Sequence, residues 1–527
     1  MAVAGLVTHN WHSANGLMNG TQNEIWHVLN AINLWDATSW VGKDSTGMSY
    51  YLWTNYWPPG FYVFSWPFLF LLGATHQSLV LSNLGHLAIL LGSVYALGET
   101  IRSRRVGLLA MVLVMVYPSV TGNLVRFEPS VALAAWVSLG ALCLLKCRGF
   151  TDRYWSLGFA LATAGGLMMD RLSYAFFLGI PAVIEIWRGL RAGRVAERLV
   201  NTGLALFLLL MLCGYWHWNF FQLHLEEVLS QGGAGNIDSA GVYTEQRDPF
   251  ALRTWLFYVS VLVDDQAGLV PGIAGLLALA AWVIRPAGND RVLAAVVVSS
   301  LLVFSVIQKK QVYYTLPMLG CLAVLTAIWL VDLGKKGRVL TAVLLAAGVH
   351  QVGWRLLERP LFPEPLRSWV GEPLLPESWV DRSYPQARPP LWLDLPIDEV
   401  LEALPDGEIL VLSENPIWTE TYATLHLRER MEERRVWQVI GNPQRAVESA
   451  HHASALVHIG EGQLAGWPSE ELLAELMEQD SPGEQSRWPL AEVLNTAGQR
   501  YLRTQVLTWS GGEVAVWVSR AIVEMRD

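Results

Sequence analysis

The chain has 527 residues, of which 52% are hydrophobic and 16% are charged, against roughly 25% charged residues in an average soluble domain. Residues 1–358 have a net charge of +4, whereas residues 359–527 carry 14 Arg, no Lys and 27 Asp and Glu, a net charge of −13. A stretch as long and as poor in charge as the first is typical of chain embedded in lipid, which excludes a purely soluble enzyme. The acidic remainder argues against nucleic acid as a partner, because phosphate groups would repel it.

Ten apolar runs are of the length expected for membrane-spanning helices, roughly 17–25 residues with some shorter. They lie at 76–98, 104–120, 128–145, 154–169, 172–187, 197–218, 267–284, 292–307, 312–332 and 338–356. The fourth and fifth runs are separated only by Asp170-Arg171, which predicts a tight hairpin turn. Two further segments, 57–74 and 251–264, are rich in aromatic residues and proline or end in acidic residues, which favours helices lying at the membrane interface.

The charges of the loops orient these spans. If alternate loops face the cytoplasm, the loops between spans on that side receive fifteen Lys and Arg residues and the opposite loops between spans receive six, in agreement with the positive-inside rule. The outer face then receives residues 20–75, 121–128, 219–253 and 308–311 and the whole C-terminal region. Ten spans with an external C-terminus require an external N-terminus, and Met1–Val7 is too short to cross a membrane. We therefore expect a first transmembrane helix to be missing from the sequence.

The acidic C-terminal region begins with a proline-rich connector over residues 359–396, whose composition favours extended chain. Strand-like runs follow at 407–414, 434–441, 454–461, 501–509 and 512–519, with helical patterns at 416–433, 443–452 and 469–479. This alternation predicts a small soluble α/β domain over residues 397–527. The last two strands are expected to form a hairpin across Ser510-Gly511. No catalytic set is evident in the domain, which favours a structural or recognition module.

Ionisable residues beside the apolar runs mark candidate sites, because a charge in lipid is costly unless it has a partner or a function. Four segments on the expected outer face carry such residues. They are an amphipathic helix that begins at Asn23-Glu24, an aromatic-rich helix after Pro58-Pro59, the RFEPS turn with Arg126 and Glu128, and the QKKQVYYTLP segment with Lys309, Lys310, Tyr313 and Tyr314. Simple helix N-caps would also explain the two glutamates. The adjacent lysines run against the positive-inside trend, which favours a lipid phosphate as their partner.

Metal binding has weaker support. His224 and Glu227 lie three residues apart in the long external loop, but two ligands are too few for a site, and an exposed amphipathic helix is the better interpretation. Asp264-Asp265, at the end of the second interfacial segment, is a further weak candidate. The four cysteines all lie within apolar runs and are interpreted as structural. No cofactor is required, although a divalent metal stays possible.

The order of these motifs resembles the polyprenyl-phosphate-dependent membrane glycosyltransferases of the GT-C fold. Within that group it is similar to family 39, the superfamily of protein O-mannosyltransferases and aminoarabinose transferases. The resemblance covers about residues 20–355. It implies an all-α polytopic membrane bundle of about ten or eleven transmembrane helices with interfacial helices, followed by the soluble α/β domain. The implied location is the bacterial inner membrane, with the C-terminal domain on the extracytoplasmic side.

The resemblance also assigns roles to residues. The acidic pair of the first external loop falls on Asn23-Glu24; the family usually has Asp at the first position, so Glu24 would act as the base, or Asp36 or Asp44 would. The Pro-Pro motif falls on Pro58-Pro59 and is preceded by Trp57. The carboxylate before a later helix falls on Glu128, with Arg126 nearby. The phosphate-binding lysine falls on Lys309 or Lys310, with Tyr313 or Tyr314 after it.

The implied reaction moves a sugar from a polyprenyl-phosphate donor to a hydroxyl of a lipid, glycan or protein acceptor. Lys309 or Lys310, with Arg126, would hold the lipid phosphate, and Glu24 or Glu128 would deprotonate the acceptor, so that a single displacement inverts the anomeric carbon. One alternative is a catalytically degenerate GT-C-like membrane subunit, because Asn23 replaces the usual acid. Another is a transporter, which predicts ionisable residues near mid-span and inverted repeats.

Overall fold

The computed structural model describes residues 57–170, 172–221, 252–286, 288, 290–307 and 312–357, with a few positions between 27 and 35 and five strands between 409 and 519. The chain divides into two compact units, residues 1–19 with 30–387, and residues 20–29 with 388–527. The first unit is helical in its described part, and the second contains all five strands.

The helices of the first unit fall on the predicted apolar runs. In chain order they are α4 (Gly60–Leu72), α5 (His76–Leu81), α6 (Asn83–Ile101), α7 (Arg104–Met115), α8 (Pro118–Gly122), η1 (Asn123–Val125), α9 (Pro129–Lys146), α10 (Arg153–Met169), α11 (Ser173–Arg191), α12 (Val195–Leu209), η2 (Leu210–Gly214), α13 (Tyr215–Asn219), α15 (Leu252–Val261), η3 (Leu262–Gln266), α16 (Leu269–Ile284), α17 (Arg291–Val306), η4 (Leu316–Met318), α18 (Leu319–Asp332) and α19 (Lys335–Leu357). Each predicted run overlaps at least one of these helices, and α4 and α15 lie on the two interfacial segments. The tight turn between α10 and α11 is confirmed, because the amide of Ser173 donates to the carbonyl of Asp170 at 3.2 Å.

Three of the described helices are long and apolar enough to cross a membrane: His76–Ile101, Pro129–Lys146 and Val195–Asn219. A fourth results if α7 and the segment Pro118–Val125, which are bent by 61° relative to each other, form one broken span. Pro118 at the start of α8 accounts for this bend, because proline lacks the N–H that would continue the helix. Four further helices are apolar but shorter. Ten complete crossings therefore stay a prediction.

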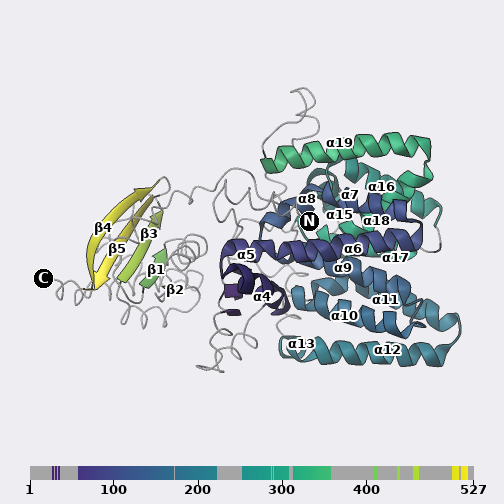
Figure 1. The fold of residues 1–527 in the computed structure, drawn as a ribbon, viewed down its shortest axis with the longest axis horizontal. Helices are drawn as coiled ribbons and strands as arrows, with labels where there is room; N and C mark the ends of the chain where they lie inside the picture. The colour runs from purple at the N-terminus through teal and green to yellow at the C-terminus, as the bar shows by residue number, and fades with distance from the viewer. Residues whose placement is uncertain are drawn as a thin grey trace. The chain divides into compact units, whose positions relative to one another are not determined.

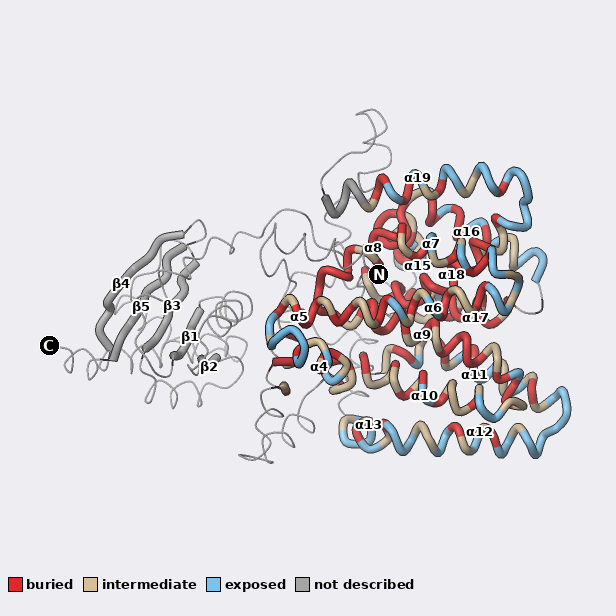
Figure 2. Tube along the Cα trace, viewed as in Figure 1, coloured by how far each residue is buried: buried red, intermediate tan, exposed pale blue. Residues whose placement is uncertain are grey.

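Helix α9 is at the centre of the helical unit, and α12 is at its edge. Thirteen of the eighteen residues of α9 are buried, whereas only Asn201 and Ala205 are buried among the fifteen of α12. Figure 2 shows this contrast as a mostly red α9 and a largely pale blue α12. Small residues on α9 allow close approach of neighbouring helices: at Gly140 an added Cβ would collide with the hydroxyl of Tyr174 on α11.

The five strands of the second unit are β1 (Ile409–Ser413), β2 (Val436–Gln438), β3 (Ala455–Glu461), β4 (Tyr501–Trp509) and β5 (Gly512–Ser519). They form one sheet in the order β2-β1-β3-β5-β4. Strand β1 pairs in parallel with β2 and β3, and β5 pairs antiparallel with β3 and β4. The predicted hairpin of the last two strands is therefore confirmed. The helical patterns expected between the strands lie outside the described residues, so the α/β layering stays a prediction.

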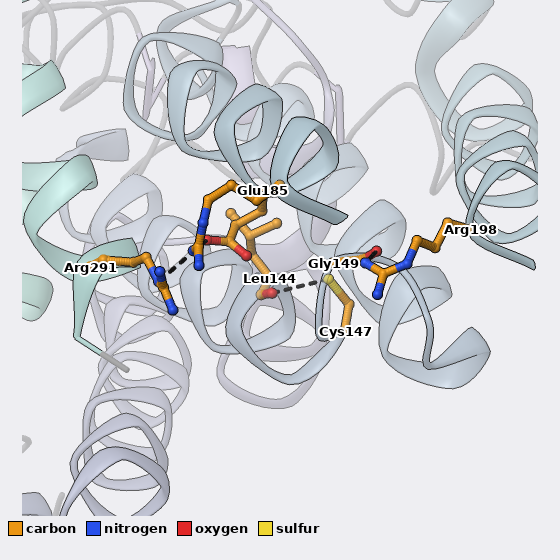
Figure 3. A network of polar contacts seen from close by, with 7 residues as sticks. Leu144, Cys147, Gly149, Glu185, Arg198 and Arg291 are labelled. Atoms are coloured by element: carbon orange, nitrogen blue, oxygen red, sulfur yellow. Dashed lines mark hydrogen bonds and ion pairs between the residues drawn. The ribbon is translucent and has the colours of Figure 1, made fainter. Parts of the chain in front are cut away.

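Ion pairs gather at the end of the helical unit that the loop charges assign to the cytoplasm. Arg102 bonds to Asp332 at 2.6 Å, and Glu185 pairs with Arg188 at 2.9 Å and with Arg291 at 3.9 Å. Figure 3 shows Glu185 and Arg291 facing each other between α11 and α17. Ion pairs thus connect helices that are distant in the sequence on this side, α6 with α18 and α11 with α17.

The turn between α9 and α10 at the same end has an unusual backbone. Arg148, Gly149 and Phe150 have φ values of 51°, 63° and 66°, a left-handed conformation that residues other than glycine rarely adopt. Two side chains of α12 stabilise the turn: Arg198 donates to the carbonyl of Gly149 at 2.8 Å, as Figure 3 shows, and Asn201 donates to that of Phe150 at 2.9 Å. Helix α12 is therefore fixed to the bundle by polar contacts at this turn.

Candidate functional site

The aromatic-rich helix α4 begins directly after the proline pair. Pro58 is buried, and Pro59 occupies the N-cap position of α4, where its carbonyl accepts from the amide of Val63 at 2.9 Å. Prolines suit this position, because the first N–H groups of a helix have no partner within it. Trp57, immediately before the pair, is half-buried. In Figure 1 α4 and α5 lie at one end of the helical unit, opposite the turn between α11 and α12.

Helix α4 packs on the turn that carries Arg126 and Glu128. The ring of Phe61 stacks on Phe127 with centroids 4.5 Å apart, and it also stacks on His86 of α6 at 6.0 Å. Two motifs that are distant in the sequence, the Pro-Pro helix and the RFEPS turn, are therefore in direct contact.

The same turn is fixed to the first residue of α6. Asn83 donates from its side-chain amide to the carbonyl of Arg126 at 2.5 Å and reaches the carbonyls of Asn123 and Leu124 at 3.4 Å. Asn123 in turn donates to the carbonyl of Ser119 at 2.7 Å. These buried amides hold a non-helical segment in place where regular backbone hydrogen bonds are lacking.

Arg126 and Glu128 are both buried, at 7% and 5% exposure, although charged residues are seldom buried without a reason. Both have extended backbone conformations, and side chains two residues apart in extended chain face the same side. Glu128 occupies the N-cap position of α9, but within the described chain its side chain accepts no capping hydrogen bond. A capping role therefore does not explain its burial. The turn therefore holds the guanidinium of Arg126 and the carboxylate of Glu128 at the start of the central helix α9.

A second polar cluster joins the neighbouring loops at this end. Gln266, the last residue of the π-helical segment η3, donates to the carbonyl of Val312 at 2.6 Å and accepts from the hydroxyl of Thr315 at 3.2 Å. Its own carbonyl accepts from Ser119 at 2.9 Å. The Arg126–Glu128 turn is thus connected, through Ser119 and Gln266, to the segment that carries Tyr313 and Tyr314.

Both tyrosines are half-buried. The ring of Tyr314 lies 5.5 Å from Phe304 at the end of α17, and that of Tyr313 lies 5.4 Å from Tyr314. Aromatic contacts therefore hold this segment against α17, while Gln266 holds it against η3.

The structure describes seven of the predicted site residues: Trp57, Pro58, Pro59, Arg126, Glu128, Tyr313 and Tyr314. Asn23, Glu24, Lys309, Lys310, His224 and Glu227, and the alternative bases Asp36 and Asp44, lie outside the described residues. In the part that is described, no group of three or more His, Cys, Asp and Glu side chains forms a metal cluster.

Three residues at this end were not selected from the sequence: Asn83, His86 and Gln266. Each is an uncharged polar or weakly basic residue within or next to an apolar run, and all three are fully buried. That placement is a usable signal, because polar residues inside membrane-spanning segments are costly without a partner. Asp264 and Asp265, named from the sequence as weak candidates, are also buried in η3, and π-helical segments occur frequently at functional sites.

No protein-family model matches the sequence, and no curated protein matches it. Solved structures do match. ArnT from Cupriavidus metallidurans, in the apo state and bound to undecaprenyl phosphate, has a TM-score of 0.57 in both structures, with 10% and 12% identity, over 98% of this chain and 96% of that chain. The archaeal oligosaccharyltransferase AglB from Archaeoglobus fulgidus, in complex with an inhibitory peptide and a dolichol-phosphate, has a TM-score of 0.47 and 10% identity over 87% of this chain and 68% of that chain.

The likeness to ArnT extends over nearly the whole chain. At this low sequence identity, it shows that the two proteins share a fold, but it does not show that they share an activity. It agrees with the resemblance that the order of the motifs indicated. The chain thus has the fold of the GT-C glycosyltransferases, and three of its described helices are long and apolar enough to cross a membrane.

Proposed function

We propose that the chain is an integral membrane glycosyltransferase that moves a sugar from a polyprenyl-phosphate donor to a hydroxyl of a lipid, glycan or protein acceptor. The observation that carries the proposal is the buried Arg126–Glu128 turn, which holds a guanidinium and a carboxylate at the end of a central helix in contact with the Pro-Pro helix α4. The fold is that of ArnT, one structure of which contains undecaprenyl phosphate. A carboxylate can act as the base for the acceptor hydroxyl, and a cation can stabilise the departing phosphate, so the two groups together suit transfer from a lipid phosphate.

In the proposed reaction the lipid phosphate binds to Arg126 and to Lys309 or Lys310. Glu128 or Glu24 takes the proton of the acceptor hydroxyl while its oxygen attacks the anomeric carbon. A new glycosidic bond forms, the bond from that carbon to the phosphate oxygen breaks, and the electron pair leaves with the phosphate. The cations stabilise the charge that develops on the leaving group. A single displacement of this kind inverts the anomeric configuration.

We further propose that the reaction takes place on the extracytoplasmic face of a bacterial inner membrane. The loop charges support this orientation, because most Lys and Arg residues lie on the opposite side. Residues 397–527 are proposed to form a soluble α/β domain on the same face, joined by the connector 359–396. The mixed five-stranded sheet of the second unit supports such a domain.

The test is transfer of sugar by membranes that contain the Glu128→Gln, the Glu24→Gln or the double Lys309→Ala/Lys310→Ala variant, with polyprenyl-phosphate-linked sugars as donors. We expect the lysine variant and at least one glutamate variant to lose activity at normal expression. The matched control is Glu99→Gln, because Glu99 is an exposed carboxylate near the other end of α6 that accepts from Tyr95 at 3.0 Å. Full activity of all three site variants would exclude the mechanism.

The same assay separates the alternatives. Wild-type membranes that transfer no sugar from any donor would favour the catalytically degenerate subunit. Movement of the lipid-linked sugar across the membrane without transfer would favour the transporter.

A further inference from the structure

Four side-chain atoms without hydrogen-bond partners lie around the Arg126–Glu128 turn. They are Oδ1 of Asn83, both ring nitrogens of His86 and Nε of Arg126, and each is inaccessible to solvent and unpaired within the part of the chain that the structure describes. Buried polar groups in proteins nearly always have a partner, and each one without a partner lowers the stability of the fold. Four such atoms in one place therefore need an explanation.

The atoms belong to residues in contact with one another or with a common neighbour. Asn83 bonds to the carbonyl of Arg126, and His86 follows Asn83 by three residues on α6, which places both side chains on the same face of the helix. His86 stacks on Phe64 at 3.8 Å and on Phe61 at 6.0 Å, and Phe61 stacks on Phe127, the residue after Arg126.

Packing alone does not account for a histidine at this position. The faces of the His86 ring are in contact with aromatic rings, and its interplanar angles with Phe64 and Phe61 are 22° and 21°. A phenylalanine would make the same stacks without burying two polar nitrogens. The imidazole therefore lowers the stability of the resting protein, and such a cost is typical of a binding site.

The unpaired atoms have the hydrogen-bonding character of a sugar site. A neutral imidazole provides one donor and one acceptor, Asn83 Oδ1 is an acceptor, and Arg126 Nε–H is a donor. A phosphate only accepts hydrogen bonds at neutral pH, so it cannot pair with Asn83 Oδ1 or with the acceptor nitrogen of His86. A hydroxyl both donates and accepts, so sugar hydroxyls are of the chemical kind that can serve as partners for both the donors and the acceptors among these atoms.

We propose that His86 and Asn83, together with the Nε–H group of Arg126, bind the hydroxyl groups of the sugar carried by the lipid-linked donor, next to the phosphate that the same arginine is proposed to hold. This inference rests on the proposed function and extends it, because it assigns the sugar to α6 and the adjoining turn and not to the lysine segment. His86 is then a substrate-binding residue that determines which sugars are accepted.

The test is the variant His86→Phe in the full-length protein, purified in detergent. The variant keeps the stacked rings and removes both nitrogens. We expect a higher Tm than that of the wild type, a KM for the lipid-linked sugar that rises about 10-fold or more, and unchanged affinity for undecaprenyl phosphate without a sugar. His86→Gln, which keeps a donor and an acceptor, should have a KM between those of the wild type and His86→Phe.

Other results overturn the inference. An unchanged KM with a higher Tm would show that His86 only packs, and a lower Tm or failure to fold would show that its nitrogens have partners in the resting protein. If the wild type transfers no sugar, the proposed function fails, and the inference is decided by ligand-induced Tm shifts instead. The ligands compared are undecaprenyl phosphate and polyprenyl phosphates that carry a hexose or a pentose. The inference is supported if the sugar-carrying ligands raise the Tm of the wild type more than undecaprenyl phosphate does, and if this additional rise is absent in His86→Phe. The absence of any such shift in the wild type would overturn it.

Discussion

The ring of Phe61 stacks on the ring of Phe127 with centroids 4.5 Å apart and an angle of 23° between the planes. Phe61 lies in the first turn of α4, two residues after Pro59, and Phe127 separates Arg126 from Glu128. Both rings are fully buried. The stack therefore determines where Arg126 and Glu128 lie relative to α4. Even a small displacement of a reacting group lowers the rate of a reaction.

The variant Phe61→Ala tests this relationship. Removing a buried phenylalanine leaves a cavity and costs about 3–5 kcal/mol of stability, and we expect sugar transfer to fall more than the loss of folded protein explains. The measurements are the Tm in detergent and the transfer rate per folded molecule. Phe61→Leu, which fills most of the space, should retain more of the stability than of the activity.

The control is Phe70→Ala in the last turn of the same helix, where the side chain is 78% exposed. A change there should shift stability by about 0.5 kcal/mol or less and leave transfer unchanged. Equal effects of the two alanine variants would show that the Phe61–Phe127 stack has no particular role.

A second prediction concerns Gln266, which bonds to Val312 and to Thr315. The variant Gln266→Leu keeps the volume of the side chain but leaves the buried carbonyl of Val312 and the hydroxyl of Thr315 without this partner. We expect a loss of about 1–3 kcal/mol and a higher KM for the donor, because the segment with Tyr313 and Tyr314 is no longer held. Tm and steady-state kinetics measure the two effects.

Ser119→Ala is the control variant. The hydroxyl of Ser119 donates to the backbone carbonyl of Gln266 and makes no hydrogen bond to the Gln266 side chain within the described residues. Its removal should lower stability by a smaller amount and leave KM unchanged. A KM for Gln266→Leu equal to that of the wild type would contradict a role of this side chain in holding the segment.

The positions of the helices could be predicted from the sequence, and the contacts of Asn83 and Gln266 could not. Apolar runs of sufficient length predict helices because a chain in lipid must satisfy its backbone hydrogen bonds internally. The partner of a buried amide depends on how helices distant in the sequence pack, and no local pattern records it. For Glu128 the sequence predicted the position but not the role. It predicted a residue at the N-terminus of a helix, which is correct, and offered helix capping as one explanation. Glutamate is not among the preferred capping residues, and in the structure its side chain does not cap α9.

Asp290, at the start of α17, predicts a pH dependence of stability. It accepts a hydrogen bond from the indole of Trp282 at 2.8 Å, and burial raises the pKa of its carboxyl above the usual value. A raised pKa means that the stability it contributes is fully present below the unfolded-state pKa and is lost as the pH rises through the folded-state pKa. At neutral pH Asp290→Asn should therefore have a higher Tm than the wild type, because asparagine accepts the same hydrogen bond without a charge.

The difference in Tm between Asp290→Asn and the wild type should shrink as the pH is lowered towards 4, which thermal melts over a pH series can measure. Asp290→Leu should have a lower Tm than Asp290→Asn at every pH, because it leaves Trp282 without this partner. A difference that grows at low pH would contradict the assignment.

The last prediction concerns the cysteines. Cys143, Cys147, Cys213 and Cys321 are all free and buried. Cys147, directly after α9, donates to the carbonyl of Leu144 at 3.0 Å, and burial raises the pKa of its thiol to about 11. Because the thiolate is the reactive form, we expect a maleimide at pH 7 to leave the native protein unlabelled and to label all four cysteines after unfolding in SDS. Intact mass gives the number of labels.

The variant Tyr154→Cys provides the positive control, since position 154 is 86% exposed one residue into α10; it should gain a single label within minutes. The α9–α10 turn carries the three left-handed residues that α12 holds by hydrogen bonds from Arg198 and Asn201. The variant Asn201→Ala, which removes the hydrogen bonds of Asn201 to the carbonyls of Phe150 and Thr151, should let the turn open and make Cys147 the first of the four thiols to react. If another cysteine reacts first in that variant, the bond from Asn201 does not protect the turn.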